Sequence, residues 1–200
     1  FTARQQIGNF LYDVDTEARA LQVLNSNTFQ LIDTLELPDP AGVAVAANNR
    51  YVFTSNRGDD SMSVIGADAF FPDFHQEIAR IKVGRGPHAI ACQMNSEDVL
   101  VANDLDNTVS IVELGTLTVR KTLNALTDAP RDIVATPRQS GFGWNAGVYF
   151  AYIANFTGNS VVVYESGPDG PQGIEYVVAL AAPFPYRDLP WYLSGRLADE

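Results

Sequence analysis

The sequence predicts an all-β protein made of repeated four-stranded antiparallel sheets, and the repeats are the main evidence. Short hydrophobic strands that end in Asn or Asp recur along the chain, and each is followed, after a polar turn, by a second hydrophobic strand. The strand-ending anchors are Asp15, Asn56, Asn103 and Asn155. They lie roughly 40 to 50 residues apart, a period typical of architectures that repeat one small sheet.

A proline marker keeps step with the anchors. Pro40, Pro87 and Pro130 each open a short apolar stretch that precedes an anchor. In the unit of Pro130 the distance to the anchor is longer, because the glycine-rich segment 139–147 is inserted there. The aromatic residues of this insertion either pack over the sheet or contact a ligand. Two markers that recur together indicate one structural unit.

Each unit is expected to contain four strands. In the unit that begins at Pro87, hydrophobic runs predict strands at about 88–92, 98–102, 108–112 and 118–123. The runs are rich in Val, Ile, Leu and Tyr and are separated by polar turn residues, and helical periodicity is absent. Four-stranded units of this length are typical of the blades of β-propellers. The predicted fold is therefore an all-β β-propeller with antiparallel blades, and the strands of each blade are counted here from the central channel outward.

The markers divide residues 1–200 into a single β-propeller segment of about four blades. The expected units are a partial, three-stranded blade and three complete blades, at 10–39, 40–84, 85–126 and 127–182. Residues 183–200 carry neither marker and either begin the next blade or form a tail. An open ring leaves strand edges and blade faces uncovered. We therefore expect the segment to belong to a larger ring, or else a second copy to close the ring.

Two stretches carry a family resemblance. Tyr51-Val-Phe-Thr-Ser-Asn56, followed by Met62-Ser-Val-Ile65, is similar to Tyr-Val-Thr-Asn, a short turn, and Val-Ser-Val-Ile. The segment 98–112 is the closest copy of this pattern. Over about residues 10–182 the chain thus resembles the YVTN-type repeats of quinoprotein-like β-propellers. The resemblance implies a ring of about seven blades and an extracytoplasmic protein, whether periplasmic, secreted or on the cell surface. It implies no particular chemistry.

The chain is acidic, with a formal net charge of −11. Phosphate contacts need clustered Lys and Arg, so this charge argues against binding nucleic acid and against docking on anionic lipid. With Cys92 as the single cysteine, no internal disulfide is expected. No apolar run approaches the ~18 residues of a membrane span. The start at Phe1 is interpreted as a removed leader or a cut.

The candidate site lies where loops gather at one mouth of the channel. The loops between the second and third strands meet there with the entries to the first strands, and both sets are charged. The candidate ligand-binding residues are Arg57, Asp59, Arg85, His88, Asp104, Asp106, Arg131 and Asp132. A mixed-charge rim can orient a polar ligand through bidentate contacts. The anchors Asn56, Asn103 and Asn155 are expected to be structural instead, because Asn bonds backbone groups in tight turns and tolerates left-handed conformations.

No cofactor is predicted, although two acidic stretches leave calcium open. They are Asp13-Val-Asp15-Thr-Glu17 and Asp104-Leu-Asp106. Calcium is bound by several oxygen ligands, but neither stretch completes an EF-hand-like loop, and Asp is common in turns. His75 and His88 are too few for a transition-metal cluster.

These observations predict a non-catalytic binding or scaffold propeller that recognises a protein or a polar ligand through the charged channel mouth. No Gly-x-Ser-x-Gly, His-Glu-x-x-His or Cys-x-x-Cys-His motif occurs. One alternative is an enzyme or redox propeller with a cofactor or metal at the mouth, lined by His88, Arg131 and Asp132. Another is a structural module of a cell-surface repeat protein. Expected partners are the ligand and the rest of the propeller or a second copy, without nucleic acid or membrane insertion.

Overall fold

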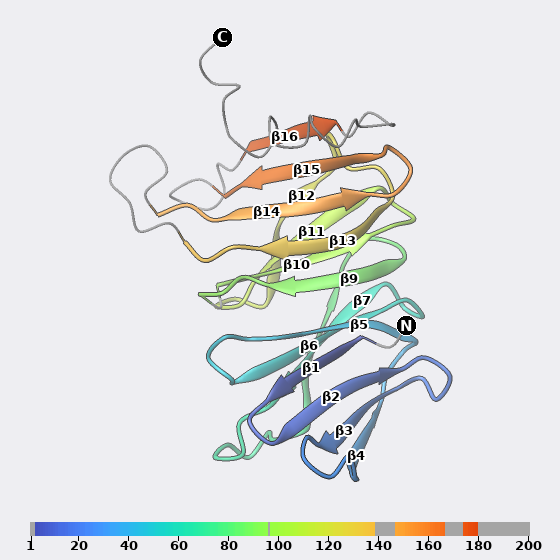
Figure 1. The fold of residues 1–200 in the computed structure, drawn as a ribbon, viewed down its shortest axis with the longest axis vertical. Coiled ribbons are helices and arrows are strands. Elements are labelled where there is room, and N and C mark those ends of the chain that lie inside the picture. The colour runs from blue at the N-terminus through green and yellow to red at the C-terminus, as the bar shows by residue number, and fades with distance from the viewer. Residues whose placement is uncertain (1–2, 96, 139–146, 167–173, 180–200) are drawn as a thin grey trace.

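The computed structural model describes residues 3–95, 97–138, 147–166 and 174–179, the last range as backbone only. Within these residues every regular element is a β-strand, and the strands form four separate four-stranded sheets. Figure 1 shows the sheets stacked one after another from the N-terminal to the C-terminal part of the chain. This confirms the prediction of an all-β fold made of four-stranded antiparallel units. The sheets are called blades 1 to 4 below.

Each blade is a meander in which the strands pair in chain order. Blade 1 consists of β1 (Arg4–Ile7), β2 (Phe10–Asp15), β3 (Ala20–Asn25) and β4 (Leu31–Glu36). Blade 2 consists of β5 (Pro40–Val45), β6 (Tyr51–Asn56), β7 (Ser61–Gly66) and β8 (Glu77–Lys82). Blade 3 consists of β9 (Pro87–Cys92), β10 (Asp98–Asn103), β11 (Thr108–Glu113) and β12 (Thr118–Leu123). Blade 4 consists of β13 (Pro130–Ala135), β14 (Phe150–Asn155), β15 (Ser160–Glu165) and β16 (Ile174–Ala179).

Blade 1 corrects one prediction. The segment 10–39 was expected to be a three-stranded partial blade, but β1 pairs with β2 from Arg4 opposite Asp13 to Ile7 opposite Phe10 and completes it. The strand Arg4–Ile7 escapes sequence analysis because it has no proline marker and three of its four residues are polar. Those three side chains are exposed, so the innermost strand of this blade has no need of the apolar run that marks the others.

The inner and middle strands of adjacent blades pack face to face and form the core. Between blades 1 and 2 the buried cluster includes Tyr12 and Val52. Between blades 2 and 3 it includes Phe53, and between blades 3 and 4 it includes Leu100 and Ile153. Strands β6, β10 and β15 are buried on both faces for this reason, and each fully buried aliphatic or aromatic side chain contributes about 1.5–3 kcal/mol.

One buried charge cluster joins blades 3 and 4. The guanidinium of Arg120, on β12, pairs through both Nε and Nη2 with the Asp98 carboxylate on β10, and the Nε–Oδ1 distance is 2.8 Å. The hydroxyl of Tyr149, in blade 4, donates to Asp98 Oδ2 at 2.6 Å. Burial, with the neighbouring Asp98 charge, raises the pKa of Tyr149. Asp98 is only 4% exposed, and its charge is compensated by a bidentate pair and a phenol.

The recurring anchors make cross-strand hydrogen bonds. Asn56 Nδ2 donates to the hydroxyls of Ser61 and Ser63 at 3.0 and 2.7 Å, and Asn103 makes the equivalent pair of bonds to Thr108 and Ser110. The left-handed residues of these hairpins are Asp60, Asn107 and Asn159, which lie later in the turns. The prediction that the anchors are structural is therefore confirmed. Asn155 bonds backbone groups as expected, since it accepts from the Asp128 amide and donates to the Leu126 carbonyl, both at 3.0 Å. The left-handed conformation, in contrast, is adopted by later turn residues and not by the anchors.

A loop of blade 2 reaches back to blade 1. The 67–76 loop lies between β7 and β8, and it stacks Phe74 against His75 with ring centroids 3.7 Å apart. His75 Nε2 lies 3.3 Å from the hydroxyl of Tyr12 on β2, and the Phe74 ring meets Phe10 edge-on at 5.3 Å. Burial raises the pKa of Tyr12 to about 12 and lowers the pKa of His75. The loop thus adds a contact between blades 1 and 2 beyond their packed faces.

Blade 4 has one apolar face without a neighbouring sheet among the described residues. Val134 on β13 and Tyr152 on β14 are paired across the two strands and exposed. In the described part of the chain no helix is long and apolar enough to cross a membrane. The insertion at 139–147, apart from Gly147, and the segment 183–200 lie outside the described residues.

Candidate functional site: the channel mouth

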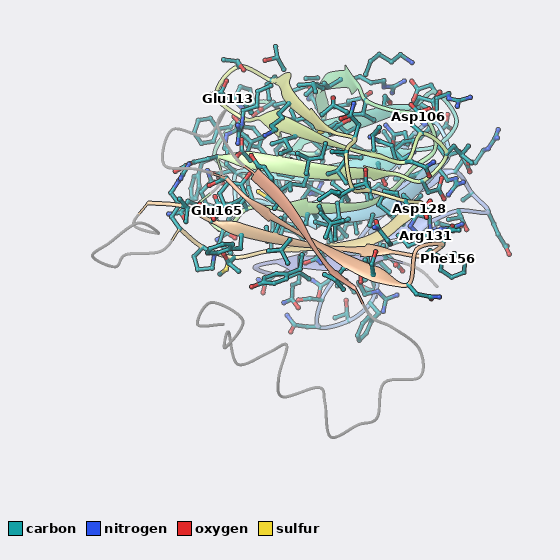
Figure 2. All side chains as sticks on the ribbon, turned by 90° about the horizontal axis from the view of Figure 1, so that it is seen from above. Asp106, Glu113, Asp128, Arg131, Phe156 and Glu165 are labelled. Carbon is teal, nitrogen blue, oxygen red and sulfur yellow. The ribbon has the colours of Figure 1, made fainter. Side chains whose placement is uncertain are left out.

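The first strands of the four blades line a common groove. Its volume is about 460 Å³, and its walls come from Ala3 and Gln5 at β1, residues 41–43 of β5, 88–90 of β9 and 131–133 of β13. The first strand of every blade therefore faces the channel, as the repeat analysis predicts. Figure 2 shows which loops share one end of the blades: Asp106, Asp128, Arg131 and Phe156 lie together, and Glu113 and Glu165 lie at the opposite end.

The centre of the site is Asp104, which lies between two arginines from different blades. Its side chain is 2% exposed, and its Oδ2 lies 3.4 Å from Nη1 of Arg57, in blade 2, and 3.5 Å from Nη1 of Arg131, in blade 4. Asp104 Oδ1 is buried and has no hydrogen-bond partner among the described residues. Both distances exceed the ~2.7–2.9 Å of a charge-assisted hydrogen bond. Neither guanidinium is held bidentately by this carboxylate.

The backbone around Asp104 leaves no room for a larger residue at Gly86. The Asp104 amide donates to the Gly86 carbonyl at 3.1 Å, and a Cβ on Gly86 would lie 2.5 Å from Asp104 Oδ1. Gly86 also has a φ of +64°, which glycine adopts without strain. This close approach holds Asp104 against the backbone at Gly86.

His88 forms part of the groove wall and is half-buried. Ser55 Oγ donates to its carbonyl oxygen at 2.6 Å, which fixes the strand against blade 2. Burial lowers the pKa of His88, and the nearby charges of Arg57 and Arg131 lower it further, against the opposing effect of Asp104 and Asp132. The imidazole is therefore neutral near pH 7.

Sequence analysis missed two exposed apolar side chains beside this site, Leu105 next to Asp104 in the chain and Phe156 against Arg131. Leu105 is 63% exposed at the tip of the β10–β11 turn, and Phe156 is 71% exposed at the tip of the β14–β15 turn. The Arg131 guanidinium carbon lies 5.3 Å from the centroid of the Phe156 ring. The available signal was an apolar residue after a strand-ending anchor, where polar residues usually stand. Arg57, Asp104, Leu105, Arg131 and Phe156 are called the mouth patch below.

Three of the predicted residues pair with partners other than the residues around Asp104. Arg85 and Asp106 pair with each other at 2.6 Å, and the Arg85 amide donates to the same carboxylate at 2.7 Å. Both bonds lower the pKa of Asp106, and the bond from the Arg85 amide has the larger effect. Asp59 faces the outer strand β8, where it lies 3.6 Å from Arg80. The structure brings together Arg57, His88, Asp104, Arg131 and Asp132, and it engages the other three elsewhere.

Several of the carboxylate oxygens considered for calcium are already engaged, while Oδ1 of Asp13 and Oδ1 of Asp104 are buried without a partner among the described residues. Arg4 Nη2 pairs with Asp13 at 2.6 Å, and Asp15 Oδ1 accepts the amides of Glu17 and Ala18 at 3.0 and 2.9 Å. Across the described ranges no group of three or more His, Cys, Asp or Glu residues could hold a metal ion. The expectation of no cofactor, with calcium left open, stays a prediction.

Comparison with known proteins establishes the fold class. No family model matches the chain, and no curated protein is similar to it in sequence. Hydrazine synthase of Kuenenia stuttgartiensis is similar in structure, with 17% identity, a TM-score of 0.67, and coverage of 86% of this chain and 47% of that one. The WD40 repeats of RRP9 match with 12% identity, a TM-score of 0.67, and coverage of 86% and 48%. The dihydro-heme d1 dehydrogenase NirN, in complex with DHE, matches with 14% identity, a TM-score of 0.62, and coverage of 90% and 37%.

The fold is therefore a β-propeller, as the sequence predicts. The chain spans about half the length of the first two solved structures that it matches, and less of NirN. At these identities the likeness concerns the fold alone.

Proposed function

We propose that the chain is a non-catalytic binding propeller that recognises a protein or a polar ligand through its channel mouth. One observation carries the proposal: Arg57 and Arg131 approach the same buried oxygen of Asp104 from different blades, and neither is held bidentately. A guanidinium has five donors in a planar fork, and pairs of such forks suit carboxylates and phosphates. The two arginines are thus held at the rim of the groove by one long contact each to Asp104, which leaves further N–H donors of each guanidinium for a ligand.

The test uses anion probes on the natural protein. Succinate and phosphate are titrated while thermal stability is followed, because a ligand that binds only the folded state raises the melting temperature. Arg131→Ala and Arg57→Ala should each abolish the shift, whereas Arg80→Ala, which removes the same charge from outer strand β8, should leave it unchanged. If anions stabilise the three variants and the parent protein alike, the mouth is not the binding site.

A second candidate function is an enzyme or redox propeller. It is favoured by one observation: His88, Arg131 and Asp132 all line the same groove. NirN, one of the similar structures, is a dehydrogenase in complex with DHE. An absorption spectrum and a metal analysis of the purified natural protein test this candidate. A stoichiometric chromophore or metal that is lost in His88→Ala would replace the binding proposal.

The proposal also covers the family to which the chain belongs and its cellular location. We assign the chain to the YVTN-type propellers on the strength of its repeat, and on that basis we expect it outside the cytoplasm; detection of the protein in periplasmic or secreted fractions checks this. We also propose that further blades, or a second copy, cover the exposed apolar pair Val134 and Tyr152. The intact mass and solution mass of the natural protein distinguish the two arrangements.

A further inference from the structure

The mouth patch combines two features that point to one class of partner. Its arginines remain accessible, since Arg57 and Arg131 are 33% and 45% exposed. Its apolar tips, Leu105 and Phe156, extend from the turns of blades 3 and 4. The patch residues carry two accessible positive charges and one buried carboxylate, beside two exposed apolar side chains, on a protein with a net charge of −11.

The parts of the patch are physically continuous. Leu105 follows Asp104 in the chain, Asp104 contacts both arginines, and Arg131 lies against the Phe156 ring. A carboxylate that binds between the arginines would lie near the Phe156 ring that Arg131 contacts, and Leu105 stands one residue from Asp104 on the turn of blade 3. Because the tips stand on exposed turns and not within the groove, a chain that crosses the rim can contact them, while a small anion confined to the groove cannot.

We propose that the mouth patch binds an acidic peptide segment of a partner protein, with a carboxylate between Arg57 and Arg131 and an apolar side chain against Phe156 and Leu105. The inference rests on the proposed function and adds the chemistry of its partner. Charge complementarity selects the partner: an acidic segment meets the cations of the patch. A basic segment would place its charges beside the two arginines. Aromatic and Arg residues are also the residue types that dominate binding energy at protein interfaces.

The experiment measures fluorescence anisotropy with three labelled peptides and the natural protein. The first alternates Glu with Phe and Leu, the second replaces the apolar residues with Ser, and the third replaces Glu with Lys. The first peptide should bind at least about 10-fold more tightly than the other two, because each loses one of the two contacts. Its affinity should fall as ionic strength rises, because exposed charges are screened.

Variants locate the contact. Arg131→Ala and Arg57→Ala should each weaken the first peptide about 10-fold or more, which corresponds to the loss of a charge-assisted hydrogen bond. Phe156→Ala should weaken the first peptide and leave the second unchanged. Arg80→Ala on the outer strand β8 is the control and should change neither. Phe156 and Arg131 are exposed, so these variants are expected to fold, and circular dichroism melts verify this.

The outcomes separate this inference from the function on which it rests. Equal binding of the first and third peptides, or binding that does not respond to Arg131→Ala and Phe156→Ala, overturns the inference. If succinate binds in an Arg131-dependent manner but the first peptide does not bind, the partner chemistry is wrong and the binding function stands. If the arginine variants change neither peptide binding nor anion binding, both the proposed binding function and the proposed peptide partner are wrong.

Discussion

Two buried aspartates in this protein meet arginines in opposite ways. Asp98, between blades 3 and 4, is 4% exposed and is saturated by the two-point pair with Arg120 and the Tyr149 hydroxyl. Asp104, at the channel mouth, is 2% exposed, yet it has one oxygen without a partner among the described residues and two arginines at 3.4 and 3.5 Å. In the first arrangement both carboxylate oxygens are engaged within the fold, although Nη1 of Arg120 is buried without a partner among the described residues. The second leaves donors for a molecule from outside, and burial alone does not distinguish them.

The largest expected effect is on Asp98. Asp98→Asn removes the charge that compensates buried Arg120, so the free energy of unfolding should fall by about 3–5 kcal/mol. Denaturant titration measures this. The control is Asp106→Asn, which breaks an exposed pair with Arg85 and should cost no more than about 1 kcal/mol. Similar losses in the two variants would contradict the structural role of the cluster.

Tyr149→Phe should have the next largest effect. The substitution keeps the ring and removes one hydrogen bond to a buried charged group, at a cost of about 1.5–3 kcal/mol. Equilibrium unfolding of the variant and of Asp98→Asn, together with the double variant, checks that the two act through one cluster. Additive losses in the double variant would show that Tyr149 and Asp98 are independent.

Asp104→Asn should cost little stability. Its contacts are long, and both arginines can remain hydrated when the charge is removed, so the expected loss is about 1 kcal/mol or less. The same change increases the positive charge of the mouth patch and should strengthen binding of the acidic peptide. A loss of stability as large as that of Asp98→Asn would end the distinction between the two aspartates.

The smallest expected effect is a pH dependence that comes from the mouth. The pKa of His88 is lowered in the folded protein, mainly by burial, from the ordinary value of 6.5. Below about pH 6.5 the unfolded chain therefore binds more protons, and the free energy of unfolding falls as the pH falls. Denaturant titrations at several pH values should show a shallower fall for His88→Gln. An unchanged slope would mean that His88 is not protected from protonation.

The sequence predicts the blades well because their determinants are local. A proline opens the inner strand, an Asn closes the next, and hydroxyl residues five and seven positions after Asn56 and Asn103 receive its amide. β1 was missed because its residues are polar and face the channel or solvent. The outer strand β12 was predicted at its observed bounds although it is largely exposed, so the lack of an apolar run and of a proline marker, and not exposure alone, concealed β1.

The site was only half predictable, for a different reason. The position of a loop within its blade indicates which residues lie near the channel mouth. It does not determine which arginine pairs with which carboxylate. Arg85 pairs with Asp106 within its own blade, while Arg57 and Arg131 come from different blades to Asp104. That choice depends on how adjacent blades are rotated and packed. Phe156 and Leu105 were missed because a turn position alone does not indicate an interaction surface.

The 67–76 loop couples the opening of blades 1 and 2. In repeat proteins each unit opens with a free energy set by its own stability and by its interface with the neighbour. Here Phe74 and His75, from a loop of blade 2, also contact Phe10 and Tyr12 of blade 1, so blade 1 cannot separate from blade 2 without breaking these aromatic contacts. The two blades therefore form one unit of opening, and their backbone amides should exchange with solvent deuterium at a common, slow rate.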